Sequence, residues 1–101
     1  MTVWLIIDVI ALDDVILYNE AREVTETTIG NIAVRFKNDS AWYTPPISCG
    51  VLPGCMRQHL LEKAELKERT ITLDELTLVE ELKLLNSVRG TWIGVLEFNR
   101  D

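Results

Sequence analysis

The chain has 101 residues, of which 48% are hydrophobic and 26% are charged, so we expect one small folded domain and not a disordered chain. Its net charge is −6, with sixteen acidic residues against ten basic ones, and the basic residues form no stripe along the sequence. This distribution argues against binding to nucleic acid or to an anionic membrane surface.

Apolar runs alternate with turns through the N-terminal half. Residues 3–12 fit either a buried strand or a helix buried on all sides, because periodicity alone does not separate the two. This run contains Asp8, lacks a basic flank and is too short for a bilayer, so we expect a cytoplasmic chain with reduced thiols. The alternation then predicts an antiparallel meander. Its strands are predicted at residues 15–18, 24–28, 32–36 and 41–44.

A loop-forming stretch at residues 44–57, TPPISCGVLPGCMR, leads into the main predicted helix, which runs from Gly54 to about Ala64. A helix start presents free backbone N–H groups at the positive end of the helix dipole. The corner therefore predicts an anion site, most often one for phosphate. The predicted apolar face of the helix consists of Met56, Leu60, Leu61 and Ala64.

The remaining residues predict two strand regions around a short helix. Residues 66–71 have the mixed polarity of a strand near a sheet edge. Thr72 and Glu75 form a capping box that begins a helix ending near Val79. Strands at 82–85 and 91–98 flank a turn at 86–90. The predicted fold class is α+β, an antiparallel β meander plus two short helices.

Cys49, Cys55 and His59 are the only soft metal ligands in the chain. Their spacing, C-x5-C-x3-H, matches no zinc motif, and a fourth ligand would have to be an acid. We interpret them as two small buried thiols and one histidine on a helix surface, and we expect no metal site. Nucleophile elbows, Walker loops and dinucleotide fingerprints are absent from the sequence.

Three segments together resemble the C-terminal domain of the class IV aminotransferase family, the fold-type IV pyridoxal-phosphate enzymes. They are LYNEAREVTETTIGNIAV at 17–34, TPPISCGVLPGCMR at 44–57 and LLNSVRGTWIGV at 84–95. The second is the most specific, because it resembles the family pattern T-P-P-x-S-x-G-x-L-P-G-x-x-R. The resemblance covers residues 14–98, which leaves 1–13 as an atypical N-terminal segment and 99–101 as a tail. It implies part of the large domain of such an enzyme.

Roles for five residues follow from the resemblance. It implies that Glu26 pairs with the pyridine nitrogen of pyridoxal 5′-phosphate and keeps that nitrogen protonated. Asn31 matches an asparagine near the ring. The backbone N–H groups of Cys55 and Met56, after Gly54, are implied to hold the cofactor phosphate. The cofactor expected by resemblance is therefore pyridoxal 5′-phosphate.

The third segment carries the remaining implied residues. Ser87 and Val88 match a second loop on the phosphate side of the cofactor. Residues 88–90 lie where the family meets substrate carboxylates, and the charge of Arg89, next to Gly90, suits such a contact. The sequence NSVRG at residues 86–90 resembles the 4-amino-4-deoxychorismate lyase branch more than the branched-chain and D-amino acid aminotransferases.

The chain departs from the family pattern in its lysines. The family's Schiff-base lysine lies further upstream of Glu26 than this chain extends, and an upstream arginine that contacts the phosphate is missing too. We therefore expect no catalytic residue in this chain and little or no activity of the chain alone. All lysines follow Glu26, at Lys37, Lys63, Lys67 and Lys83.

The preferred interpretation is a truncated domain of a homodimeric enzyme that acts on a small amino substrate. The intact enzyme would eliminate pyruvate from 4-amino-4-deoxychorismate and leave p-aminobenzoate for folate synthesis. An amino-acid transaminase fragment is the alternative within the family. A non-catalytic α+β domain that binds a partner or its own copy is the alternative outside it.

Overall fold

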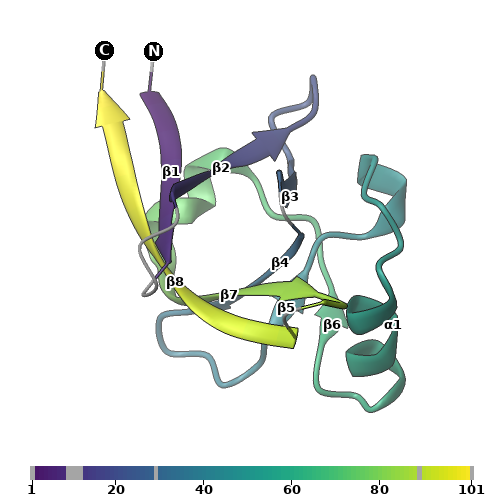
Figure 1. The fold of residues 1–101 in the computed structure, drawn as a ribbon. Coiled ribbons are helices and arrows are strands. Elements are labelled where there is room, and N and C mark those ends of the chain that lie inside the picture. The colour runs from purple at the N-terminus through teal and green to yellow at the C-terminus, as the bar shows by residue number, and fades with distance from the viewer. Residues whose placement is uncertain (1, 9–12, 29, 89, 101) are drawn as a thin grey trace.

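The computed structural model describes residues 2–8, 13–28, 30–88 and 90–100. Their strands form one eight-stranded sheet in the order β3-β2-β1-β8-β7-β4-β5-β6, which is strongly curved (Figure 1). The strands are β1 Thr2–Asp8, β2 Asp13–Tyr18, β3 Val24–Thr27, β4 Asn31–Phe36, β5 Tyr43–Thr44, β6 Lys67–Glu68, β7 Val79–Asn86 and β8 Gly90–Arg100. The helices are α1 Cys55–Glu62 and the two 3-10 helices η1 Ile47–Cys49 and η2 Leu73–Leu78. The α+β fold class is confirmed.

Strand pairing brings the two ends of the chain together. β1 pairs antiparallel with β2 and, along residues 2–8, with the C-terminal strand β8 (Figure 1). Residues 2–8 are therefore a strand and not a helix, whereas residues 9–12 lie outside the described residues. β4 pairs with β7 and β5 and not with β3. The meander predicted for the whole first half thus stops at β3.

The curved sheet encloses the main hydrophobic core, to which strands on both sides of the curve and η2 contribute. Alternate residues of β4 point to opposite faces of the sheet, so Ile32 and Val34 enter this core while Ala33 faces the other side. On that outer side Ala33, Leu66 and Leu85 form a second cluster, against which α1 packs. The core consists of Ile16, Val24, Ile32, Val34, Phe36, Ile71, Leu73, Leu76, Leu82 and Leu84.

Helix α1 is shorter than the sequence predicts. It ends at Glu62, and Ala64 has a φ of +60° and is exposed, so the prediction that Ala64 belongs to the apolar face is wrong. The left-handed residue closes the helix, because the Glu65 N–H donates to the Leu60 carbonyl at 2.9 Å. The described residues include no helix with the length and apolarity that a bilayer crossing requires.

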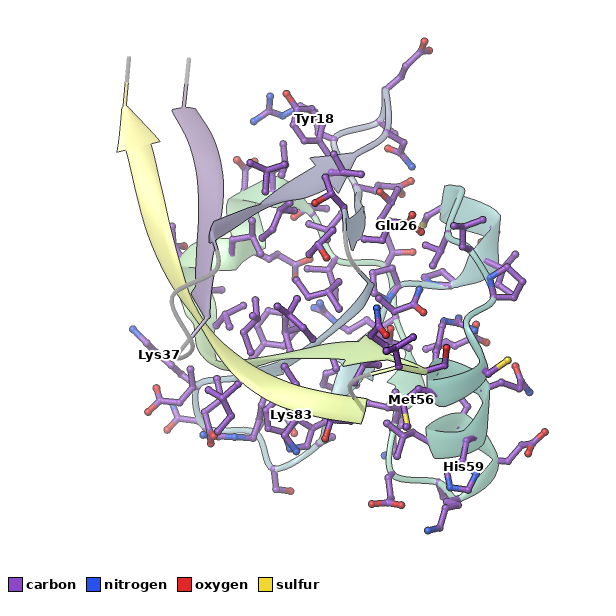
Figure 2. The ribbon with its side chains drawn as sticks, in the orientation of Figure 1. Tyr18, Glu26, Lys37, Met56, His59 and Lys83 are labelled. Atoms are coloured by element: carbon purple, nitrogen blue, oxygen red, sulfur yellow. The ribbon has the colours of Figure 1, made fainter. Side chains whose placement is uncertain are left out.

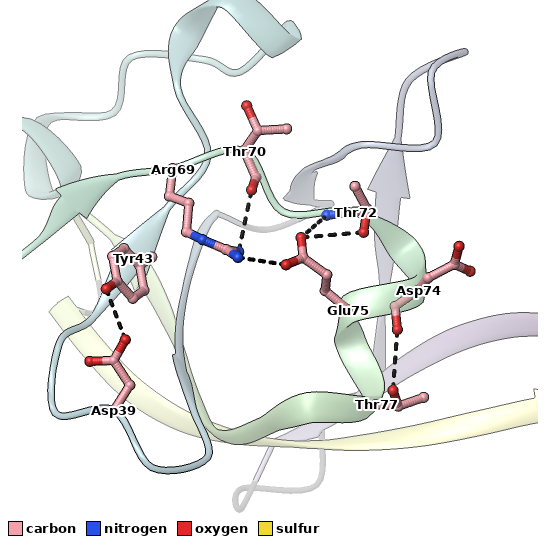
Figure 3. Close-up of polar contacts among 8 residues, drawn as sticks. All are labelled: Asp39, Tyr43, Arg69, Thr70, Thr72, Asp74, Glu75 and Thr77. Carbon is pink, nitrogen blue, oxygen red and sulfur yellow. Dashed lines mark hydrogen bonds and ion pairs between the residues drawn. The ribbon is translucent and has the colours of Figure 1, made fainter.

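The capping box at the start of η2 is confirmed and extends into an ion pair (Figure 3). Glu75 Oε1 accepts from the Thr72 backbone N–H at 3.0 Å and from the Thr72 hydroxyl at 3.3 Å. Its other oxygen accepts from Arg69 Nη2 at 2.5 Å, and the Arg69 guanidinium lies 4.5 Å from the centre of the Phe36 ring. The bond from Arg69 is the main reason why the pKa of Glu75 is lowered. This cluster fastens η2 to the strands beneath it.

Two further predictions concern the sheet edge. The strand predicted at 66–71 shrinks to the two residues of β6, which pairs in parallel with β5 and ends the sheet. Its predicted place near an edge is confirmed.

In the hairpin before β5, the Tyr43 hydroxyl donates to Asp39 Oδ2 at 2.9 Å (Figure 3). A backbone bond from Ala41, followed by this bond, lowers the pKa of Asp39.

Candidate functional site

A pocket of about 270 Å³ lies where the β3–β4 turn, the loop before α1 and the end of β7 meet. Three segments that are far apart in the sequence form its wall. Figure 2 shows Glu26 and Met56 on the same side of the molecule, where the loop before α1 and α1 itself lie. The lining residues are Glu26, Thr27, Thr28, Gly30, Asn31, Leu52, Gly54, Cys55, Met56, Leu85, Asn86 and Ser87.

Glu26 lies on β3, half-buried, with its neighbours Thr25 and Thr27 buried. Its Oε1 atom accepts a hydrogen bond from the Leu52 backbone N–H at 2.8 Å. This bond fixes the direction of the carboxylate and also holds the loop before α1 against β3. Glu26 is the only charged residue among the described residues that line the pocket.

Asn31 bonds the carbonyl of the same residue, Leu52. It begins β4 and is only 6% exposed, and its Nδ2 atom donates to the Leu52 carbonyl at 3.0 Å. Its Oδ1 atom lies so close to Gly54 that a Cβ added there would be 2.3 Å from it. Glycine is therefore needed at residue 54 for close approach, not for its backbone angles, which are φ −63° and ψ 148°.

The first turn of α1 supplies backbone donors to the pocket. Gly54 is the N-cap and provides no side-chain cap. Among the hydrogen bonds of the described residues, the N–H groups of Cys55 and Met56 have no acceptor, as expected for the first residues of a helix. Both residues line the pocket. This arrangement has the chemistry of an anion site at a helix start.

The loop before α1 is tied down at both ends. The Thr44 hydroxyl donates to the Ile32 carbonyl at 2.7 Å. Arg57, which is 1% exposed, donates from Nη2 to the Pro45 carbonyl at 3.0 Å and to Glu68 Oε2 at 2.5 Å. One guanidinium thus joins the beginning of the loop, the first turn of α1 and β6.

The turn between β7 and β8 provides the last part of the wall. Ser87 lines the pocket, and Asn86, another lining residue, accepts the Val88 N–H on its Oδ1 at 2.7 Å. Val88 is 90% exposed, and neither it nor Gly90 lines the pocket. Arg89 lies outside the described residues.

Six of the residues that the resemblance implies for the cofactor therefore surround one pocket. They are Glu26, Asn31, Gly54, Cys55, Met56 and Ser87. Sequence reasoning missed Leu52 and Asn86, which were interpreted only as loop and turn residues. The Asn-Ser-Val turn was a usable signal for Asn86, because an asparagine often accepts the N–H two residues ahead.

No lysine or arginine is among the described residues that line this pocket. Lys37 lies at the far end of the molecule, and Lys83 lies against Trp42 on the outer face of the sheet (Figure 2). An anion here would accordingly be held by backbone N–H groups and not by a side-chain cation.

The two cysteines have different environments. Cys49 is buried, and burial raises the pKa of its thiol. Cys55 is exposed, so the expectation of two buried thiols is wrong for Cys55, which lies in the first turn of α1 and lines the pocket. His59 is exposed, as expected. The described residues contain no group of three or more His, Cys, Asp or Glu placed to hold a metal ion.

Comparison with known proteins identifies the fold and the family. Residues 11–96 match the family described as Amino-transferase class IV. The chain is 42% identical over 86 residues to a Schizosaccharomyces pombe protein described as "Putative aminodeoxychorismate lyase", covering 82% of this chain and 36% of that protein. The chain therefore belongs to the class IV aminotransferase family, and it spans about a third of the length of this relative.

Solved structures agree with this assignment. The fold is similar to that of a "Putative amino-acid aminotransferase" from Mesorhizobium loti, with a TM-score of 0.74 and 35% identity, over 79% of this chain and 38% of that one. It is also similar to a "Putative 4-amino-4-deoxychorismate lyase" from Legionella pneumophila, with a TM-score of 0.71 and 30% identity, over 80% of this chain and 31% of that one. The fold is thus part of a fold-type IV domain.

Proposed function

We propose that the pocket binds pyridoxal 5′-phosphate and that the chain is the cofactor-binding portion of a class IV enzyme. The observation that carries the proposal is the meeting of one carboxylate, Glu26, and one uncapped helix start, at Cys55 and Met56, in a single pocket. A pyridinium nitrogen and a phosphate are the two ends of the cofactor, and these two groups suit them. The donor set therefore fits the cofactor.

The chain's own residues would fix the orientation of the bound cofactor. Glu26 would accept a hydrogen bond from the protonated ring nitrogen and keep the proton there. The Leu52 N–H holds Glu26 in place for this task. The N–H groups of Cys55 and Met56, with Ser87 opposite, would hold the phosphate. When bound, pyridoxal phosphate supplies a ring that accepts electrons as a bond next to the substrate amine breaks.

For the reaction we propose elimination of pyruvate from 4-amino-4-deoxychorismate, which leaves p-aminobenzoate. The 42% identity to the S. pombe protein supports this choice. Transamination of an amino acid is the second candidate, favoured by the likeness to the M. loti structure. A non-catalytic role is the third, because no lysine is among the described residues that line the pocket.

Binding is tested with pyridoxine 5′-phosphate, which has the ring and the phosphate but no aldehyde that surface lysines could capture. We expect saturable binding by calorimetry, and much weaker binding of pyridoxine, which lacks the phosphate. Glu26→Gln keeps an acceptor for the Leu52 N–H but removes the charge, so we expect about tenfold weaker binding. Glu20→Gln, in an exposed turn, is the matched control. Equal affinity of the two ligands would contradict a phosphate site at α1.

The reaction is tested in a chimera in which this chain replaces the matching 86 residues of the S. pombe relative. Release of p-aminobenzoate from 4-amino-4-deoxychorismate would support the lyase. Transfer of an amino group to a 2-oxo acid without such release would favour the transaminase. A chimera that binds the cofactor and catalyses neither reaction would leave the non-catalytic role.

A further inference from the structure

A second pocket, of about 310 Å³, lies on the outer face of the sheet beside α1. Among the residues that the structure describes, Leu85 alone lines both this pocket and the candidate cofactor pocket. Its volume is at the small end of the range for ligand pockets, so it suits a small ligand. The lining residues are Ala33, Trp42, Leu60, Glu65, Leu66, Lys83, Leu85 and Thr91.

Lys83 provides a positive charge at this pocket. Its Nζ atom lies 4.2 Å from the centre of the Trp42 ring, and the residue is half-buried on β7. The ring holds the ammonium in place by a cation–π interaction. No carboxylate among the described residues forms an ion pair with Lys83. A ligand carboxylate is the group that this ammonium lacks.

Glu65 provides a negative charge at the same pocket. Its only ion pair among the described residues is with Lys63, at 3.7 Å, and both side chains are 57% exposed. An exposed pair at this distance is worth less than about 1 kcal/mol, so Glu65 can change partner at little cost. Glu65 and Lys83 line one pocket without pairing with each other. The pocket therefore presents both charges separately to a ligand.

We propose that this pocket binds a small zwitterionic α-amino acid with an apolar side chain. The ligand carboxylate pairs with Lys83, its ammonium pairs with Glu65, and its side chain packs on Leu60 and Leu66. A ligand with only one charge contacts either Lys83 or Glu65 but not both. The proposal concerns a different pocket from the cofactor and does not depend on cofactor binding.

The test uses three probes that share one isobutyl side chain and differ in their charged groups. They are L-leucine, 4-methylpentanoate, which lacks the ammonium, and 3-methylbutylamine, which lacks the carboxylate. Binding is followed by NMR at the Trp42 indole N–H and at the backbone of Leu66 and Thr91. We expect L-leucine to shift these signals saturably, and each partial probe to bind about tenfold more weakly, which is the loss of one charge-assisted contact.

Variants locate the site. Lys83→Met keeps most of the side-chain stem but removes the charge, and we expect it to bind L-leucine about tenfold more weakly. We expect a slightly smaller loss of affinity for Glu65→Gln. Lys37→Met, in an exposed turn away from the pocket, is the control and should bind as the unmodified chain does. Failure of L-leucine to saturate, equal binding of 4-methylpentanoate, or unchanged binding in Lys83→Met would each overturn the proposal.

Discussion

Replacing Gly54 with alanine tests how the two sides of the candidate pocket are held together. The new Cβ would lie 2.3 Å from Asn31 Oδ1, whereas ordinary contact begins at 3.4 Å, so the Asn31 side chain must move by roughly 1 Å. The hydrogen bond from Asn31 to the Leu52 carbonyl, now 3.0 Å, would then be lost. That loss costs about 1 kcal/mol of stability.

Two other consequences of Gly54→Ala oppose each other. Alanine accepts φ −63° and ψ 148° without strain, so it lowers the entropy of the unfolded chain and stabilises by about 0.5 kcal/mol. Alanine is a poorer N-cap than glycine by a similar amount. The expected net loss of stability is therefore about 1 kcal/mol, and nearly all of it comes from the displacement of the Asn31 side chain.

A double-mutant cycle with Asn31→Ala isolates this contact. Because Asn31→Ala removes the atom that Cβ would meet, Gly54→Ala should cost almost nothing in that background, which gives a coupling of about 1 kcal/mol. Urea unfolding midpoints with unchanged m-values provide the measurement. If Gly54→Ala costs the same with and without Asn31, the close approach is not what selects glycine here.

Three other predictions concern stability. Leu84→Ala, in the main core, should lower the free energy of unfolding by about 2–5 kcal/mol in urea. The folded-state pKa of Glu75 is lowered, mainly by Arg69, so the contribution of Glu75 to stability is present above its unfolded pKa and is lost as pH falls through its folded pKa. Glu75→Gln should therefore reduce the loss of stability as the pH becomes acidic. An unchanged acid dependence of the free energy of unfolding would refute this. Arg57→Met should destabilise the fold by about 2–3 kcal/mol, and Glu68→Gln by less than about 1 kcal/mol, because Arg57 is buried while the Glu68 side chain remains 47% exposed to water. Thermal unfolding of the two variants provides the measurement. Equal losses of stability would show that only the ion pair matters.

Sequence patterns predicted the local features that depend on neighbouring residues. The capping box of Thr72 and Glu75 formed because both partners belong to one turn. The start of β7 was placed too late, at Leu82, because Val79 joins the strand only through pairing with Phe36 on β4. The 3-10 helix η1 was missed among loop-forming residues, although Gly50, with φ +97°, marks its end. Pairing across the sheet is not visible in a local pattern.

The candidate site shows the same limit. The prediction of an anion site at the start of α1 came from the loop and helix signals alone, whereas the grouping of Glu26 and Ser87 came from family resemblance. Bringing β3, α1 and the β7–β8 turn to one pocket requires the order of strands in the sheet, which sequence alone did not supply. The exposure of Cys55 has a similar cause, since the face that α1 presents to the sheet depends on how it packs on Ala33 and Leu85.

The backbone of Leu52 links the two sides of the candidate pocket, because its N–H and its carbonyl both form hydrogen bonds to residues that line it. Its N–H donates to Glu26 on one side, while its carbonyl accepts from Asn31, which in turn contacts Gly54 at the start of α1. A displacement of Asn31 therefore reaches Glu26 through the backbone of Leu52, since that one residue makes both hydrogen bonds. It follows that Gly54→Ala should weaken binding of pyridoxine, which has the ring and no phosphate, as well as that of pyridoxine 5′-phosphate. A loss confined to the phosphorylated ligand would show that the two ends act independently.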